Sequence, residues 1–207
     1  MVGRPVNQQR RVELLDAAVD YAVKNGFSEV SWRPVAAALE VSPTALVHHF
    51  GTKEQMLVAI LGRLRERIVV AMNHSSSERG DLVTATRRAW KAASNPKRSG
   101  EYRLFFEVYG RALQTPQPFA EFLDHVVADW MHALVEAQGP DVDPPTATRT
   151  ATLVIATIRG LLLDLLATDD RARVQNAAES FLANLERQGH DPADLPDQHF
   201  LDVPSGN

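Results

Sequence analysis

Apolar residues recur at spacings of three and four along nearly the whole chain, which is the period of an amphipathic helix. The first such set includes Leu14, Ala18 and Ala22, and Gly26 follows it as a helix-stopping residue. No stretch shows sustained alternation of apolar and polar positions between turn signals, as strands do. The chain is therefore predicted to be all-α, with about nine helices and no sheet.

Polar capping residues and prolines mark where these helices begin. Ser31 and Ser42 each precede a short helical run, and Pro43 takes the first helical position, where a missing N–H costs nothing. Residues 52–55 (Thr-Lys-Glu-Gln) have the form of a capping box that opens a long helix ending near Met72. Later helices are expected to begin near Asp81, Ser99, Gln117, Asp143 and Asp169.

A change in helix length predicts how the chain is divided. Three helices fill residues 8–50, the last two separated by only a few residues, and longer helices fill residues 53–188. We expect a helix-turn-helix unit with an N-terminal arm in residues 1–52 and a larger helical domain in residues 53–189. Residues 190–207, rich in Pro, Asp and Gly, are expected to form a tail.

The composition is that of an ordinary globular protein. The 207 residues are 44% apolar and 23% charged and include no cysteine, which excludes disulfides, cysteine zinc fingers and thiolate nucleophiles. The N-terminus lacks the apolar run of a secretory signal, and the longest apolar stretch, Leu153 to Ala167, is predicted to be too short to span a bilayer. A soluble, cytoplasmic protein with no membrane contact is expected.

The net charge of −4 does not by itself indicate a nucleic-acid partner. Residues 1–53 carry 6 basic and 5 acidic side chains, a balance of +1, whereas the remainder carries 16 and 21, a balance of −5. This asymmetry is mild, so the placement of the basic side chains matters more than their sum.

Residues 31–50 contain the motif that carries function. Pro43 to His49 form a short predicted helix that Leu46 anchors while Thr44, Ala45 and His48 point outward. Such a helix fits the major groove of DNA, and short side chains near its N-terminus can approach the base edges. The apolar positions able to hold it against the preceding helix at a steep angle are Val35, Ala36, Leu39, Val41, Leu46 and Phe50.

Together with the flanking positions, this motif resembles the DNA-binding domain of the tetracycline-repressor (TetR) family of transcriptional regulators, from about Arg10 to Leu61. The resemblance covers about a quarter of the chain, and the remaining long helices match the family's ligand-binding and dimerisation domain only in order and length. The matching residues are Leu14, Leu15, Ala17, Ala18, Gly26, Phe27, Ser31, Arg33, Val35, Ala36, Val41, Ser42, Leu46, His49, Phe50, Lys53 and Glu54.

The resemblance implies which residues contact DNA. Ser31, Arg33 and His49 stand where members of the family contact phosphates, and Arg4 resembles an arm that reaches into the minor groove. Lys53 lies at a helix start, whose free N–H groups also favour a phosphate. The implied contacts are Arg4, Ser31, Arg33, Ser42, Pro43, Thr44, Ala45, His48, His49 and Lys53.

Two positions in this stretch depart from the family pattern. Val47 stands where the family most often has a Tyr that contacts DNA, so one hydroxyl contact is absent. Glu40 occupies a turn position that is frequently Gly, and a positive φ there costs a side-chain-bearing residue about 1 kcal/mol.

Aromatic residues cluster in the second domain, where 7 of the 14 lie between residues 102 and 130. Core packing is the commoner role for such rings, but they can also form the wall of a cavity for an apolar small molecule. For Arg159 three interpretations stay open: reaching to the surface, pairing at a subunit interface, or receiving an anionic ligand. The candidate ligand-binding residues are Trp90, Tyr102, Phe105, Phe106, Tyr109, Trp130, His132 and Arg159.

The helices predicted at about 145–167 and 170–188 carry broad apolar faces that one subunit cannot wholly cover. Packing against their copies would make a four-helix interface in a two-fold homodimer, which the family resemblance also implies. The candidate interface residues are Leu153, Ile158, Gly160, Leu161, Leu165, Val174, Ala178, Phe181 and Leu185.

The sequence thus predicts a ligand-responsive regulator, a repressor, that binds a palindromic double-stranded DNA operator as a homodimer and responds to a small, largely apolar effector. The alternative is a helical small-molecule-binding dimer without specific DNA binding, motivated by Val47 and the weak positive charge. An enzyme is disfavoured because no catalytic triad, nucleophile elbow or phosphate loop pattern is present. No cofactor or metal is expected, since the adjacent His48 and His49 face different directions on a helix.

Overall fold

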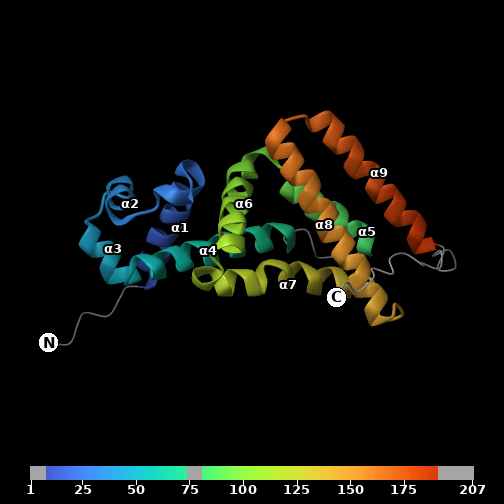
Figure 1. The fold of residues 1–207 in the computed structure, drawn as a ribbon, viewed down its shortest axis with the longest axis horizontal. Helices are drawn as coiled ribbons and strands as arrows, with labels where there is room; N and C mark the ends of the chain where they lie inside the picture. The colour runs from blue at the N-terminus through green and yellow to red at the C-terminus, as the bar shows by residue number, and fades with distance from the viewer. Residues whose placement is uncertain (1–7, 74–80, 191–207) are drawn as a thin grey trace, which may run out of the picture.

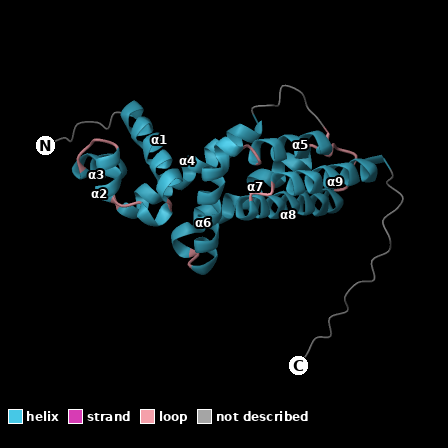
Figure 2. Ribbon diagram, turned by 90° about the horizontal axis from the view of Figure 1, so that it is seen from above, coloured by secondary structure: helices cyan, strands magenta, loops and turns pink. Residues whose placement is uncertain are grey.

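The computed structural model describes residues 8–73 and 81–190, and residues 1–7, 74–80 and 191–207 lie outside it (Figure 1). The described residues form nine α-helices and three 3-10 helices with no strand (Figure 2), which confirms the all-α prediction. The short 3-10 helices are η1 (Phe27–Glu29), η2 (Pro96–Arg98) and η3 (Gln117–Phe119). The α-helices are α1 (Gln8–Asn25), α2 (Trp32–Ala38), α3 (Pro43–Phe50), α4 (Lys53–Asn73), α5 (Leu82–Ala93), α6 (Ser99–Gln114), α7 (Ala120–Glu136), α8 (Pro144–Thr168) and α9 (Arg171–His190).

Helices α3 and α4 begin at the capping residues that the sequence predicts. Ser42 Oγ accepts the N–H of Ala45 at 3.1 Å, which satisfies one of the free donors at the start of α3. Thr52 and Gln55 form a reciprocal capping box: Gln55 N–H donates to Thr52 Oγ1 at 3.2 Å, and Thr52 N–H donates to Gln55 Oε1 at 2.8 Å. Two consecutive helices in the N-terminal unit are therefore started by local hydrogen bonds.

The start of α9 differs from the prediction. Asp169 ends α8 with a positive φ of 55° instead of opening the next helix. Asp170 is the residue that caps α9, because its carboxylate accepts the N–H of Arg173 at 3.1 Å. The helix predicted to begin near Gln117 also starts later than expected. A 3-10 turn occupies Gln117–Phe119, and α7 begins at Ala120.

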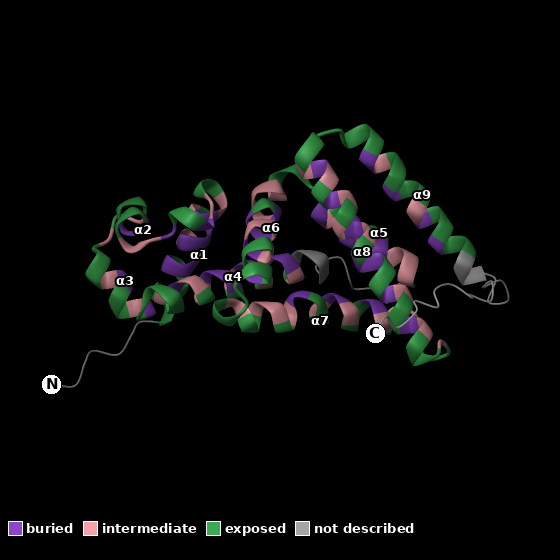
Figure 3. Ribbon diagram, viewed as in Figure 1, coloured by how far each residue is buried: buried purple, intermediate pink, exposed green. Residues whose placement is uncertain are grey.

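The helices are arranged along an elongated molecule (Figure 1). Helices α1–α3 lie at one end and α8 and α9 at the other, while α4 leads from the first unit into the second and α6 stands steeply across it. Helix α6 contacts α1, α4, α7 and α8, so it joins both units. Buried positions follow the sides that face neighbouring helices, and much of the outer surface of α8 and α9 is exposed (Figure 3).

Ion pairs hold α4 against α1. The guanidinium of Arg63 donates to both carboxylate oxygens of Asp16, at 2.7 and 2.9 Å. Arg67, one turn further on, donates to Asp16 at 2.9 Å and to Asp20 at 2.6 Å. The hydrogen bonds from Arg63 are the main reason that the pKa of Asp16 lies below its usual value.

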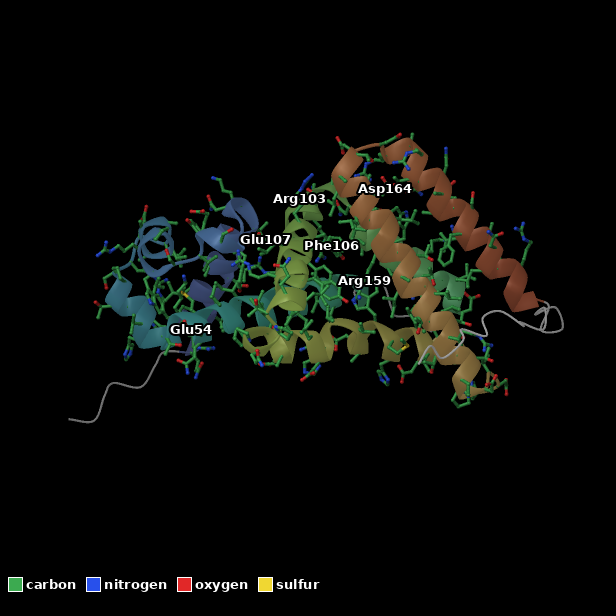
Figure 4. All side chains as sticks on the ribbon, in the orientation of Figure 1. Glu54, Arg103, Phe106, Glu107, Arg159 and Asp164 are labelled. Atoms are coloured by element: carbon green, nitrogen blue, oxygen red, sulfur yellow. The ribbon has the colours of Figure 1, made fainter. Side chains whose placement is uncertain are left out.

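A second connection joins α6 to the N-terminal unit through Glu107 (Figure 4). Its carboxylate accepts the backbone N–H of Phe27 at 2.9 Å and of Ser28 at 3.3 Å, and the Ser28 hydroxyl donates to it at 3.1 Å. Near the start of α6, Gly100 allows close contact with α1, because a Cβ there would lie 2.8 Å from the Val23 side chain. Helix α6 is thus attached to the N-terminal unit at two points.

Helix α8 is longer than the apolar stretch Leu153 to Ala167, which was expected to be too short to span a bilayer. It begins at Pro144, ahead of the apolar stretch from Leu153, and by length and composition alone it is long and apolar enough to cross a bilayer. The core helix of a soluble protein can satisfy the same criterion. Its buried residues, such as Val154, Ile158 and Leu162, lie in the core, and α8 packs against both α7 and α9.

Replacing Asp16 by Asn should lower the free energy of unfolding at pH 7 by about 1–3 kcal/mol, because charge-assisted hydrogen bonds from two guanidinium groups are weakened. The folded-state pKa of Asp16 is depressed, so its contribution is present above the unfolded-state pKa near 3.9 and is lost as the pH falls through the folded-state pKa. Urea unfolding should therefore show the deficit shrinking below about pH 4. The matched variant Asp20→Asn, which removes one ion pair of a more exposed carboxylate, should cost less. A deficit that is the same in acid and at pH 7 would contradict the assignment.

Candidate functional site

Helices α2 and α3 form a helix-turn-helix whose two helices are held by buried apolar side chains. Val35 on α2 and Leu46 on α3 are fully buried, and Phe50 is nearly so. In the turn between them, the N–H of Val41 donates to the carbonyl of Ala36 at 3.0 Å. The inner side of α3 is therefore anchored, which leaves its other side free to meet a partner.

The turn takes the left-handed backbone conformation that favours glycine. Glu40 has a φ of 54°, so its side chain adopts a conformation that costs about 1 kcal/mol relative to Gly. The side chain of Glu40 is exposed, and the neighbouring turn residues keep their hydrogen bonds. The substitution is therefore a cost in stability that leaves the helix-turn-helix geometry in place.

The exposed face of α3 carries three residues at helical spacing. Thr44, Val47 and His48 are exposed, whereas Ala45, which was also expected to point outward, is half-buried. Val47 is 44% exposed, so it belongs to this face although the sequence prediction omitted it. Helical spacing indicates this position in the sequence, because Val47 lies three residues after Thr44 and one before His48.

His49 lies beside this face, where it is half-buried with Nδ1 enclosed and without a partner. Burial, followed by the charges of His48, Arg10 and Arg11, lowers the pKa of His49 below its ordinary value. The ring is therefore neutral at pH 7 and retains one N–H that can donate to a phosphate. The side chain of Arg11 donates to the His49 carbonyl at 3.3 Å and so ties α1 to the end of α3.

The remaining predicted DNA contacts lie around α3. Ser42 and Pro43 are exposed at its start, Arg33 is exposed on α2, and Lys53 is exposed at the first position of α4. Ser31 precedes α2 without capping it by its side chain, so its hydroxyl is not used there. Arg4 lies outside the described residues.

The candidate ligand-binding residues separate into an interior group and one surface residue. Trp90 is buried and donates its Nε1–H to Gln175 at 2.9 Å, which ties α5 to α9. His132 is different, because its side chain is 78% exposed and lies 3.5 Å from Glu136 on the same helix. It therefore lies apart from the interior group, which comprises Tyr102, Phe105, Phe106, Tyr109, Trp130 and Arg159.

Arg159 lies among three aromatic rings of this group, and Figure 4 labels its position. Its guanidinium lies 5.7 Å from the ring centre of Phe105, 5.5 Å from Tyr109 and 5.9 Å from Trp130. Its Nη2 donates to the carbonyl of Val126 on α7. Of the three interpretations left open by the sequence, reaching to the surface does not describe this position, since the guanidinium lies among the three rings and donates to Val126.

A small cavity adjoins these rings between α4, α6 and α7. Its volume is about 20 Å³, room for about one water molecule. The Arg65–Asp129 ion pair lies at its margin, with N–O distances of 2.5 and 2.8 Å. The lining includes Leu61, Leu64, Ile68, Phe105, Phe122, Val126 and Trp130.

The predicted dimer residues also divide into two sets. Five of them are buried within their own subunit and are not available to a partner: Ile158, Leu165, Val174, Ala178 and Leu185. Leu153 is 61% exposed, Gly160 is exposed, and Leu161 and Phe181 are half-buried. Leu163, which was not among the predicted residues, is also exposed, at 52%.

Comparisons with known proteins agree with this architecture. The family model described as bacterial regulatory proteins, tetR family, matches residues 14–60, which include α2, α3 and most of α1. The HTH-type transcriptional regulator BetI of Rhizobium meliloti (strain 1021) is 32% identical over 124 residues, which cover 51% of this chain and 61% of that protein. The matched region thus spans less than two thirds of this curated relative.

Solved structures match over nearly the full length. A transcriptional regulator from Rhodococcus sp. Rha1 superposes with a TM-score of 0.72 at 26% identity, covering 86% of this chain and 96% of that chain. The multidrug binding protein EbrR complexed with proflavin matches with a TM-score of 0.60 at 26% identity, covering 85% and 99%.

The fold and the α2–α3 geometry define a helical protein with a helix-turn-helix unit, an arrangement found in bacterial transcriptional regulators. Residues 14–60 match the model of the tetR family of bacterial regulatory proteins, and the fold is similar to that of solved transcriptional regulators over most of the chain.

Replacing Glu40 by Gly should raise the free energy of unfolding by about 1 kcal/mol, because the positive φ no longer strains a side-chain-bearing residue. For a chain of this size the melting temperature should rise by about 2–4 °C. The control is Glu40→Ala, which also removes the carboxylate but keeps a Cβ at the strained position and should bring no such gain. If both variants gain equally, the charge of Glu40 and not its backbone conformation limits stability.

Proposed function

We propose that this protein is a cytoplasmic transcriptional repressor that binds a palindromic operator as a homodimer and loses or gains DNA affinity when a small, largely apolar effector binds. The observation that carries the proposal is α3, which is anchored by buried Leu46 and Phe50 and exposes Thr44, Val47 and His48. A helix held in this way is rigid enough to enter the major groove in one register.

The chemistry of the exposed face suggests how it reads DNA. The Thr44 hydroxyl and the His48 imidazole can form hydrogen bonds with base edges, and the Val47 methyl groups can contact a thymine methyl. Phosphate contacts from Arg33 and Lys53 supply affinity and position but no sequence information. Because Val47 has no hydroxyl, its contribution is apolar and favours A·T pairs at the base it faces.

The dimer interface of this proposal follows the exposed stripe of α8. Leu153, Ala156, Gly160 and Leu163 recur at spacings of three and four along this helix and are all exposed. The small residues Ala156 and Gly160 allow a second α8 to approach closely across a two-fold axis. With α9 beside it, this stripe would form a four-helix contact between subunits.

The effector response rests on the coupling between the two units. The EbrR structure holds proflavin, which supports binding of small molecules by this fold. Here α6 contributes Phe105 and Tyr109 to the interior group and Glu107 to the N-terminal unit. A ligand that moves α6 or α4 would change the separation of the two α3 helices, and DNA accepts only spacings near one helical turn, about 34 Å, or multiples of it.

The alternative, a dimer that binds small molecules without specific DNA binding, is favoured by the exposed Glu40 and Glu54 near α3, which oppose phosphate binding. A gel-shift experiment with the DNA that flanks the protein's own gene separates the two functions. Retardation that survives an excess of random DNA supports the repressor, and its absence supports the alternative.

Two substitutions should separate affinity from specificity. Lys53→Gln should weaken binding to every DNA sequence and reduce the slope of log affinity against log salt by about one, because one phosphate contact is lost. Thr44→Ala should cost about 1–3 kcal/mol on the operator but little on random DNA. Lys24→Gln, which removes an exposed lysine at the far end of α1, is the control and should change neither. Equal losses on operator and random DNA for Thr44→Ala would count against base reading by Thr44.

Leu163→Glu should convert the dimer to a monomer, because a carboxylate on the α8 stripe would be buried without a partner in the interface. Its side chain is 52% exposed in one subunit, so the monomer should remain folded. The matched control is Leu113→Glu on α6, where an even more exposed leucine lies away from α8. Light scattering at micromolar concentration gives the mass of each variant. A Leu163→Glu variant that stays dimeric would remove α8 from the interface.

A further inference from the structure

Arg159 is an interior charge that no carboxylate of the described chain neutralises. Four other half-buried arginines have a carboxylate partner: Arg63 pairs with Asp16, Arg65 with Asp129, Arg67 with Asp20 and Arg98 with Glu101. Arg159 has only the Val126 carbonyl, the Tyr109 side chain and aromatic faces around it, and its Nε is buried without a hydrogen-bond partner. A desolvated guanidinium is costly unless an anion reaches it.

The aromatic rings argue against a cationic occupant. Phe105, Tyr109 and Trp130 have the faces that would stabilise a bound cation, but the Arg159 guanidinium already lies within 6 Å of all three ring centres. A second positive charge placed there would meet repulsion in a medium of low dielectric constant. The same position is attractive to a negative group.

A second buried donor lies on the same face of α6. Tyr102 is one turn before Phe105, its side chain is almost completely buried, and its hydroxyl has no hydrogen-bond partner. Burial raises the pKa of Tyr102 to about 12, so the hydroxyl stays protonated and able to donate. Tyr102 Oη–H and Arg159 Nε–H are thus two buried donors without an acceptor among the described residues; the Tyr102 ring lies beside Arg98, whose Nε is likewise unpaired.

The adjoining cavity indicates where the rest of such a molecule would lie. Phe105, Val126 and Trp130 line this cavity and also contact Arg159. Its other walls are mainly aliphatic and aromatic side chains of α4 and α7. With a volume of about 20 Å³, the cavity admits a ligand only when these helices move apart.

We propose that the effector is an amphipathic organic acid whose carboxylate pairs with Arg159 and whose apolar body enters between α4, α6 and α7. The planar guanidinium matches a carboxylate with two parallel hydrogen bonds, which a neutral amide cannot reproduce. This inference rests on the proposed function, because it specifies the chemical class of that effector.

The test uses molecules that share one body and differ in charge. 4-Phenylbutyrate, 4-phenylbutanamide and 4-phenylbutylamine, together with their shorter and longer homologues, are titrated into the full-length protein by calorimetry and by thermal shift. In at least one chain length the acid should bind about tenfold or more tightly than its amide, and the amine should bind most weakly. If the acid binds no better than its amide at any length, the proposal is overturned.

Variants then assign the preference to one side chain. Arg159→Gln keeps a polar side chain of similar reach and should abolish the preference for the acid, whereas Arg159→Lys should retain part of it. Arg149→Gln, which changes an exposed arginine of the same helix, should behave as the unchanged protein. A preference that survives Arg159→Gln in a cooperatively melting protein overturns the assignment. Operator binding without ligand, measured on the same samples, tests the repressor function separately, since it does not require an acidic effector.

Discussion

The rest of the structure depends on the ion pairs that the arginines of α4 form with neighbouring helices. On one side of the helix, Arg63 and Arg67 bind Asp16 and Asp20 of α1, and on another side Arg65 binds Asp129 of α7. Helix α4 is therefore held at once to the DNA-binding unit and to the wall of the interior cavity. Bidentate guanidinium–carboxylate pairs resist rotation as well as separation. The ion pairs of α4 thus form a continuous connection from α7 to α1.

Helix α6 provides a parallel connection of a different kind. Glu107 accepts three hydrogen bonds from η1, and two residues further on Tyr109 touches the guanidinium of Arg159. The contact with Arg159 and the contact with the N-terminal unit are thus separated by only part of one helical turn. The two connections, through α4 and α6, meet on α1, so α1 can neither tilt nor slide without disturbing one of them.

The helix starts could be predicted from the sequence because a helix cap joins residues that are close together in the chain. The Ser42 cap and the capping box of Thr52 and Gln55 involve groups three residues apart, so their spacing is readable from the sequence. The partner of Arg63 is 47 residues away and belongs to another helix, and no periodicity reveals it. The same limit explains the dimer residues: the pattern of α8 marked its apolar positions, but Ile158 faces its own subunit and Leu163 faces outward. The predicted DNA contacts do not include Val47, where the family usually has Tyr. Its spacing from Thr44 and His48 nevertheless places it on the exposed face of α3.

The position of Arg159 suggests how a bound ligand would change the conformation of the protein. A ligand shifts an equilibrium only by its difference in affinity for the two conformations, and a hundredfold change in DNA occupancy requires about 2.7 kcal/mol. The guanidinium of Arg159 has no carboxylate partner among the described residues, and the cavity beside it measures about 20 Å³. An anion gains most where it is desolvated beside that charge, yet its apolar body needs space that the closed arrangement lacks. With the proposed acidic effector, the ion pair would therefore form only in an arrangement in which α4, α6 and α7 lie further apart, and the ion pairs of α4 would connect that change to α1.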